Sequence, residues 1–154
     1  MIKGAKEGVQ MKIQALGHVV IKVRDQAVAE NFYHGILGLP IAARLEKPQM
    51  TFFSLGNHHD FAISVVGEDA TSPPDKSVGL AHVAFKIGDS LEALREVKAQ
   101  LDKAEIKTMP IDHEVTQSLY FMDPDGNQVE LYADVSDVWK EDPQTVAQGK
   151  ALEI

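Results

Sequence analysis

Cysteine is absent from the 154 residues of this chain. Its absence excludes disulfides, thiolate zinc sites and cysteine nucleophiles, so any metal site must use histidine and carboxylate ligands. Basic residues are also few, with 15 Lys and Arg against 23 Asp and Glu and a formal net charge of −8. Because nucleic acids and anionic membrane surfaces bind to basic faces, we expect neither as a partner.

Long apolar runs are missing too, since no stretch approaches the roughly 18 residues that cross a membrane. Residues 1–10 carry lysines but no apolar signal core, which predicts a flexible extension, a cytoplasmic protein and Met11 as an alternative start. The chain has the length of one domain, and 44% hydrophobic residues exclude wholesale disorder. We expect a single domain over residues 11–140 and an irregular tail over 134–154.

The chain contains an internal repeat. Residues 17–25 read GHVVIKVRD and residues 81–89 read AHVAFKIGD. Both segments alternate with period two, which is typical of a half-buried strand. His18 and His82 take the same position in the two segments, on the face opposite the apolar side chains Val19, Ile21 and Val23 and, in the second segment, Val83, Phe85 and Ile87.

The segments after the two strands repeat as well. Asp25 can cap a helix that ends near Leu37, before Gly38, and Asp89 or Ser90 can cap a second helix that ends near residue 104. Three extended segments come after each helix, at 41–45, 50–55 and 61–66 and at 107–111, 118–121 and 128–132. The pattern predicts an α+β fold of two βαβββ modules, residues 14–67 and 79–133, joined by a linker.

The ends of the two modules also align. Phe53 and Ala62 are separated like Phe121 and Glu130, so Ala62 and Glu130 are equivalent. Two histidines and one glutamate are the ligand types of the facial triad, which leaves metal positions open for substrate and dioxygen. A histidine on a half-buried strand is also typical of a residue without a ligand role, and the residues alone leave both interpretations open.

The chain resembles the vicinal oxygen chelate superfamily, which includes glyoxalase I, bleomycin- and fosfomycin-resistance proteins and extradiol dioxygenases. The two strand segments carry the resemblance together with NFYHGILGL at 31–39 and FMDPDGNQVEL at 121–131, and it spans about residues 16–132. It implies a cupped, partly closed mixed sheet with the helices outside. It also implies that His18, His82 and Glu130 bind a divalent metal.

One position departs from glyoxalase I. Members of that type supply a fourth protein ligand, a carboxylate, from the last strand of module one, where this chain has Ala62. Three protein ligands fit extradiol dioxygenases and fosfomycin-modifying thiol transferases better, although Asp60 or Glu68 could take the fourth place.

The resemblance assigns roles to three further side chains. The segment NHHDFAI at 57–63 is similar to the extradiol pattern in which the second histidine, here His59, is the acid and base. Tyr120 matches a tyrosine that hydrogen-bonds the substrate hydroxyl, and His113 lies near a substrate-binding histidine. A solvated turn around His59 and a core position for Tyr120 are the structural alternatives.

Three functions are compatible with these observations. The first is an extradiol dioxygenase in which Fe(2+) binds an aromatic diol and dioxygen. The second is an isomerase, lyase or thiol transferase with Mn(2+), Ni(2+) or Zn(2+) as a Lewis acid. The third is a non-catalytic binding protein of the bleomycin-resistance type, which the intact His-His-Glu set disfavours. We expect a homodimer in each case.

Overall fold

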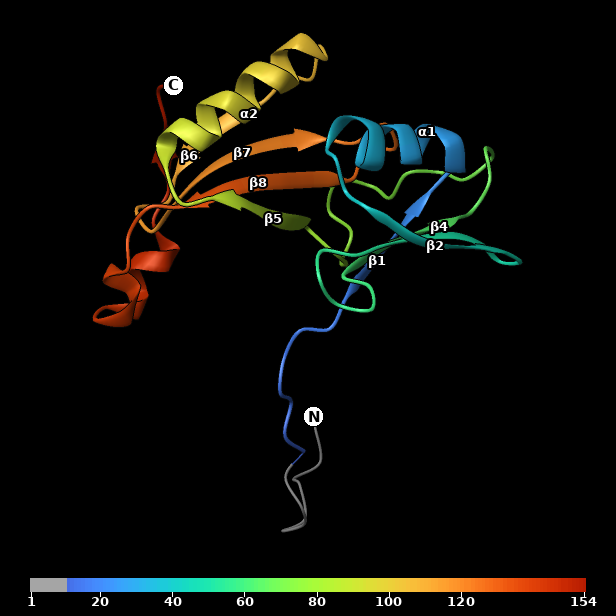
Figure 1. The fold of residues 1–154 in the computed structure, drawn as a ribbon, viewed down its shortest axis with the longest axis horizontal. Coiled ribbons are helices and arrows are strands. Elements are labelled where there is room, and N and C mark those ends of the chain that lie inside the picture. The colour runs from blue at the N-terminus through green and yellow to red at the C-terminus, as the bar shows by residue number, and fades with distance from the viewer. Residues whose placement is uncertain (1–10) are drawn as a thin grey trace.

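Each half of the chain folds as the repeat predicts (Figure 1). The computed structural model describes residues 11–154, so the extension predicted over residues 1–10 lies outside the described residues. Module one consists of β1 (Val19–Val23), α1 (Gln26–Glu30), the π-helix η1 (Asn31–Ile36), β2 (Ile41–Glu46), β3 (Gln49–Phe53) and β4 (Phe61–Val65).

Module two has the same order of elements and continues into the tail. It consists of β5 (His82–Gly88), α2 (Leu91–Lys103), β6 (Met109–Asp112), β7 (Thr116–Met122) and β8 (Gln128–Asp134). The tail, predicted to be irregular, contains the 3-10 helices η2 (Val138–Lys140) and η3 (Pro143–Ala147) and the short strand β9 (Lys150–Ala151).

The predicted helix caps are present. The Asp25 carboxylate accepts a hydrogen bond from the backbone N–H of Val28 at 2.8 Å, and the Ser90 hydroxyl oxygen accepts one from Ala93 at 3.2 Å. The first helix widens from α to π geometry after Glu30. It ends before Gly38, whose φ of 78° is the left-handed conformation that favours glycine.

The strands form two mixed sheets that do not close into a barrel, with strand orders β1-β4-β3-β2 and β5-β8-β7-β6-β9. In the first sheet Ala62 lies between Val20 on β1 and Phe52 on β3. In the second sheet Glu130 lies between Ala84 on β5 and Tyr120 on β7. These registers make positions 62 and 130 equivalent, as the sequence alignment of the modules predicts.

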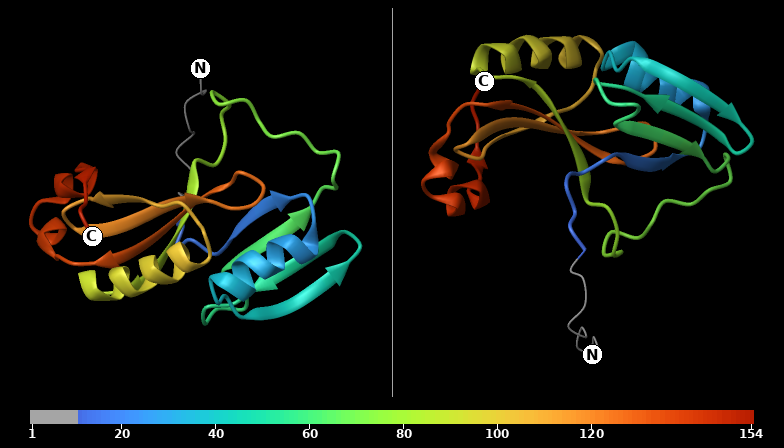
Figure 2. Two further views of the ribbon diagram at one scale, coloured as in Figure 1. Left: turned by 90° about the horizontal axis from the view of Figure 1, so that it is seen from above. Right: turned by 60° about the horizontal axis from the view of Figure 1, so that its bottom comes forward.

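The helices of both modules cover the same side of the two sheets (Figures 1 and 2). One apolar core lies beneath them and draws on both modules, from Tyr33, Phe53 and Phe61 to Leu94, Leu119 and Val129. The sheet faces that carry His18, Val20 and Glu130 point away from this core. Burial alternates accordingly along β1, where Ile21 and Val23 are buried and Val20 is exposed.

Polar contacts also fix the modules to each other. The Tyr33 hydroxyl donates to the Asp123 carboxylate at 2.8 Å, and both side chains are buried. Arg24 forms an ion pair with Asp125 at 2.9 Å and donates to the linker carbonyl of Ala70 at 2.8 Å. These contacts, together with the shared apolar core, hold the two modules against each other.

Candidate functional site

A buried carboxylate on the face of the second sheet opposite α2 is the starting point of the site. Glu130 is 7% exposed although its chain neighbours on β8 are apolar. Its Oε1 accepts a hydrogen bond from the Ser118 hydroxyl at 2.6 Å, and its Oε2 lies 3.0 Å from Nε2 of His82. A carboxylate buried without partners is costly, so these two contacts account for its position.

The donor set of this pair fits a divalent metal ion. Nitrogen and oxygen ligands lie about 2.1 Å from such an ion, so two ligands at adjacent octahedral positions are about 3 Å apart. Nε2 of His82 and Oε2 of Glu130 lie 3.0 Å apart, a separation that suits a direct hydrogen bond and also two ligands of one ion. Ser118 occupies the other carboxylate oxygen, as outer-shell partners of metal ligands do.

Tyr120 and His113 lie beside this pair. The ring of Tyr120 meets the ring of His82 edge-on, with centroids 5.4 Å apart, and its hydroxyl lies 2.9 Å from Nε2 of His113. Burial and the negative charge of Glu130 raise the pKa of Tyr120 to about 12, so the phenol keeps its proton at neutral pH.

Glu130, Tyr120 and His113 share an open pocket of about 380 Å³ on the second sheet. The tail forms one wall of it, through Trp139 and Val146. The carbonyl oxygen of Gln148, also in the tail, lies 2.6 Å from Nδ1 of His113. Three of the predicted site residues, Tyr120, His113 and Glu130, therefore line one pocket.

The remaining predicted residues form a separate cluster at the start of β1. The rings of His18 and His59 lie 4.2 Å apart between centroids, and the ring of His58 packs against that of His59 at 4.6 Å. Partial burial, followed by the neighbouring His18 and His58, lowers the pKa of His59. His59 also meets the ring of Phe52 edge-on at 5.4 Å.

One chain does not bring the three predicted metal ligands together. Among residues 11–154, no group of three His, Asp or Glu side chains is placed to hold one ion. His82 and Glu130 are paired, whereas His18 is grouped with the histidines of its own module.

Ala62 lies on the predicted face of its strand. It is fully buried but points away from the core that contains its neighbours Phe61 and Ile63. Its place beside Phe52 corresponds to that of Glu130 beside Tyr120. Module one therefore has no carboxylate at the position where module two has one.

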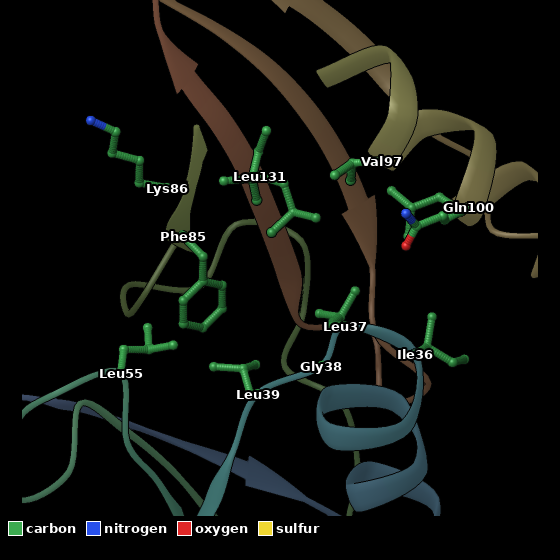
Figure 3. A pocket seen from close by; sticks show the side chains of 12 residues that line it. Ile36, Leu37, Gly38, Leu39, Leu55, Phe85, Lys86, Val97, Gln100 and Leu131 are labelled. Carbon is green, nitrogen blue, oxygen red and sulfur yellow. The ribbon is translucent and has the colours of Figure 1, made fainter. Parts of the chain in front are cut away.

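A second pocket, of about 150 Å³, lies on the helix side between the modules and has a different character (Figure 3). Its walls are mostly aliphatic and aromatic, with Leu37 and Leu39 facing Phe85 and Leu131 across the opening (Figure 3). Lys86 is the charged residue among those that line it. Such a lining offers no acid, base or ligand set for catalysis, so the candidate site is the pocket around Glu130.

Sequence reasoning missed two hydrogen-bond partners of the residues that line this pocket. Ser118 alternates with Tyr120 along β7, so its position on the same face was visible in the sequence, but its bond to Glu130 was not. The carbonyl of Gln148 carried no sequence signal, because any residue supplies a backbone carbonyl and only the path of the tail brings it to His113.

Comparison with known proteins identifies the family. The model of the Glyoxalase/Bleomycin resistance protein/Dioxygenase superfamily matches residues 15–131. The chain belongs to this superfamily. Biphenyl-2,3-diol 1,2-dioxygenase 3 of Rhodococcus globerulus is 32% identical over 125 residues, which are 77% of this chain and 63% of that protein. The chain thus spans less than two thirds of the length of this relative.

Shorter relatives of the superfamily are matched over more of their length. Glutathione transferase FosA of Serratia marcescens is 27% identical over 122 residues, which are 78% of this chain and 81% of that protein. The crystal structure of a glyoxalase family protein from Enterococcus faecalis is 28% identical, with a TM-score of 0.64 over 79% of this chain and 99% of that one.

The superfamily assignment confirms the predicted fold and narrows the kinds of reaction to be considered. Relatives of this chain include extradiol dioxygenases, lactoylglutathione lyases and thiol transferases, so members are mostly enzymes that act on small molecules with divalent metals. No helix within residues 11–154 has the length and apolar character to cross a membrane.

Proposed function

We propose that this protein is a metal-dependent enzyme that cleaves the ring of an aromatic diol with dioxygen, as extradiol dioxygenases do. One observation carries the proposal: the buried Glu130 lines one pocket with Tyr120 and His113, and the partly exposed His82 contacts both Glu130 and the ring of Tyr120. A ligand pair next to a phenol and an imidazole is suited to a substrate that binds a metal and exchanges protons. A cytoplasmic location is part of the proposal.

The metal would be held by His18, His82 and Glu130, and we propose Fe(2+) as the ion. When bound, Fe(2+) would supply a redox-active centre for electron exchange between the diol and dioxygen. The missing carboxylate at Ala62 supports a set of three protein ligands. Mn(2+), Ni(2+) and Zn(2+) suit the same donors but serve the alternative below.

A second copy of the chain would complete the ligand set. His18 and His59 are neighbours, so a partner that brings its His18 to the His82–Glu130 pair brings its His59 as well. The sheet faces opposite α1 and α2 are available for this contact, except where the tail covers one end of the second sheet (Figure 1). The proposed homodimer therefore has composite sites, each built from module one of one copy and module two of the other.

The chain's own residues would bind the substrate and move its protons. Tyr120 would hydrogen-bond a substrate hydroxyl. His59 would accept a proton, and its lowered pKa keeps the imidazole neutral and able to do so at pH 7. The ring of Phe52 beside His59 offers an apolar surface for an aromatic substrate.

A thiol transferase or lyase with a Lewis-acid metal is the second candidate. The similarity to the FosA transferase of Serratia marcescens, 27% identical over 122 residues, supports it, and so does the absence of a carboxylate at Ala62. Here the metal would polarise an oxygen of the substrate without changing its own oxidation state.

Metal identity and one assay separate the two candidates. Protein purified without oxygen is analysed for metals, loaded with Fe(2+) and given catechol and 2,3-dihydroxybiphenyl in air-saturated buffer. Ring-cleavage products, absorbing in the near-visible range, support the proposal. His59→Ala should leave the metal content unchanged and slow cleavage by about 10²–10⁴-fold, the usual contribution of an acid–base group. An iron-loaded protein that cleaves neither diol would reject the dioxygenase function.

A further inference from the structure

A hydrogen bond joins the tail to the candidate site, and its donor can be identified. Nδ1 of His113 lies 2.6 Å from the carbonyl oxygen of Gln148. A carbonyl oxygen only accepts hydrogen bonds, so Nδ1 must carry the hydrogen. In a neutral imidazole the other nitrogen, Nε2, then has a lone pair and can only accept.

The lone pair on Nε2 of His113 also fixes the direction of its hydrogen bond with Tyr120. The Tyr120 hydroxyl lies 2.9 Å from Nε2 of His113, which is a closer contact than that with the Glu130 carboxylate, the other acceptor beside it, so its single hydrogen goes to Nε2. The phenol oxygen is then left with lone pairs only. The opposite arrangement, with Nε2–H donating to Tyr120, would bring two lone pairs within 2.6 Å of each other at Nδ1 and Gln148.

The tail is held firmly enough to impose this direction. The backbone N–H groups of Val135 and Ser136 donate to the carbonyl of Val115 at 3.0 and 3.3 Å. At the far end β9 pairs with β6, with Lys150 opposite Asp112. Between these anchors, the N–H of Gln148 donates to Thr145 at 3.2 Å and closes the last turn of η3. The Gln148 carbonyl is therefore fixed from both sides.

We infer that Gln148 is a positioning residue: its carbonyl sets the tautomer of His113, so that Tyr120 presents only an acceptor to the pocket, which selects ligands with a hydroxyl donor. The ligand class is thus a phenol or a diol, in preference to ligands that offer only acceptor oxygens. This class assignment rests on the proposed function, whereas the tautomer and the direction of the hydrogen bonds do not.

The tautomer is measured by ¹⁵N NMR of the imidazole nitrogens, at a pH where imidazoles are neutral and without added metal. His113 should carry its hydrogen on Nδ1, although neutral histidine in water favours Nε2. Tyr120→Phe should keep this tautomer, because Gln148 imposes it. The control Gln148→Ala removes only the side chain, keeps the carbonyl and should change nothing. An Nε2–H tautomer in the wild type, or a switch to it in Tyr120→Phe, would overturn the inference.

Binding of phenol and anisole tests the ligand class, since anisole has the same ring without a donor. Phenol should bind about 3- to 10-fold more tightly, the size of one neutral hydrogen bond, and Tyr120→Phe should abolish the difference. His113→Phe frees the Tyr120 hydroxyl to donate and should also reduce the preference. Equal binding of phenol and anisole by the wild type would overturn the class assignment. An iron-loaded enzyme inert toward diols would refute the proposed dioxygenase and leave the NMR result intact.

Discussion

The proposed composite site can be tested by placing one defect in each copy of the chain. His18→Ala removes the ligand that lies in module one, and Glu130→Gln removes the buried carboxylate of module two. The glutamine is chosen because its amide oxygen can still accept the bond that Ser118 donates to Oε1, which preserves the packing. Each variant homodimer should bind metal poorly, because every site then lacks one of its three ligands.

The expected loss of metal affinity in each variant homodimer follows from the ligand that its sites lack. Loss of an outer-shell partner costs about 10–100-fold in metal affinity, and the loss of a direct ligand should cost more. In a heterodimer of the two variants, both defects fall in one composite site and the other site keeps all three ligands. Such a heterodimer should therefore bind about half as much metal as the wild-type dimer, in keeping with its two-fold symmetry.

The assay uses two affinity tags, one on each variant, and purification of the co-expressed chains over both columns. Bound Mn(2+) is counted by electron paramagnetic resonance at a concentration that fills the wild type and leaves both variant homodimers nearly empty. The matched control is a heterodimer that carries both substitutions on one chain and none on the other, which should lack both complete sites. A heterodimer of the single variants that is as empty as its parents would refute the composite site, because sites built within one chain would both be broken. Catechol cleavage is then measured on the same samples.

Three further substitutions probe the frame around the site. Ser118→Ala should weaken metal binding by about 10–100-fold, since the Glu130 carboxylate loses its outer-shell partner, and calorimetry with Mn(2+) checks this. Tyr33→Phe deletes a buried bond to the Asp123 carboxylate and should lower the free energy of unfolding by about 1.5–3 kcal/mol in urea denaturation, whereas a loss below about 0.5 kcal/mol would contradict the role of this bond. Hydrogen bonds from Arg44 and Thr51 and the charge of Arg44 lower the pKa of Glu30. The ionised carboxylate therefore stabilises the fold above its unfolded-state pKa, and this contribution is lost as the pH falls. Glu30→Gln should thus flatten the decline of stability between about pH 5 and pH 3, followed by thermal melting.

Much of the fold is predictable from this sequence because the pattern of one module is repeated in the other. The period-two segments recur in both modules and predict equivalent strands. Helix starts are marked by the capping residues Asp25 and Ser90, and the last strand is preceded by a turn sequence. The π geometry of residues 31–36, in which the adjacent Phe32 and Tyr33 are both buried, had no signal in the sequence.

The site was predictable in its residues and only partly in its geometry. Alternation along β5, β7 and β8 places His82, Tyr120 and Glu130 on one face, and their registers bring them together. The convergence of His18 on this group was inferred from symmetry between the modules. Symmetry gives equivalent positions but not proximity, because the docking of one module on the other depends on contacts such as Tyr33–Asp123.

The equivalence of positions 62 and 130 has an evolutionary consequence. Codons for alanine and glutamate can differ by a single base, so one mutation could give module one the carboxylate that module two already has, opposite Val20 on the neighbouring strand. Because Ala62 is fully buried, the longer side chain would need room, and the half-buried Phe52 beside it is the residue that could yield. The number of carboxylates offered to a metal would then change without any change of backbone, a short step by which one duplicated scaffold could pass from one reaction class to another.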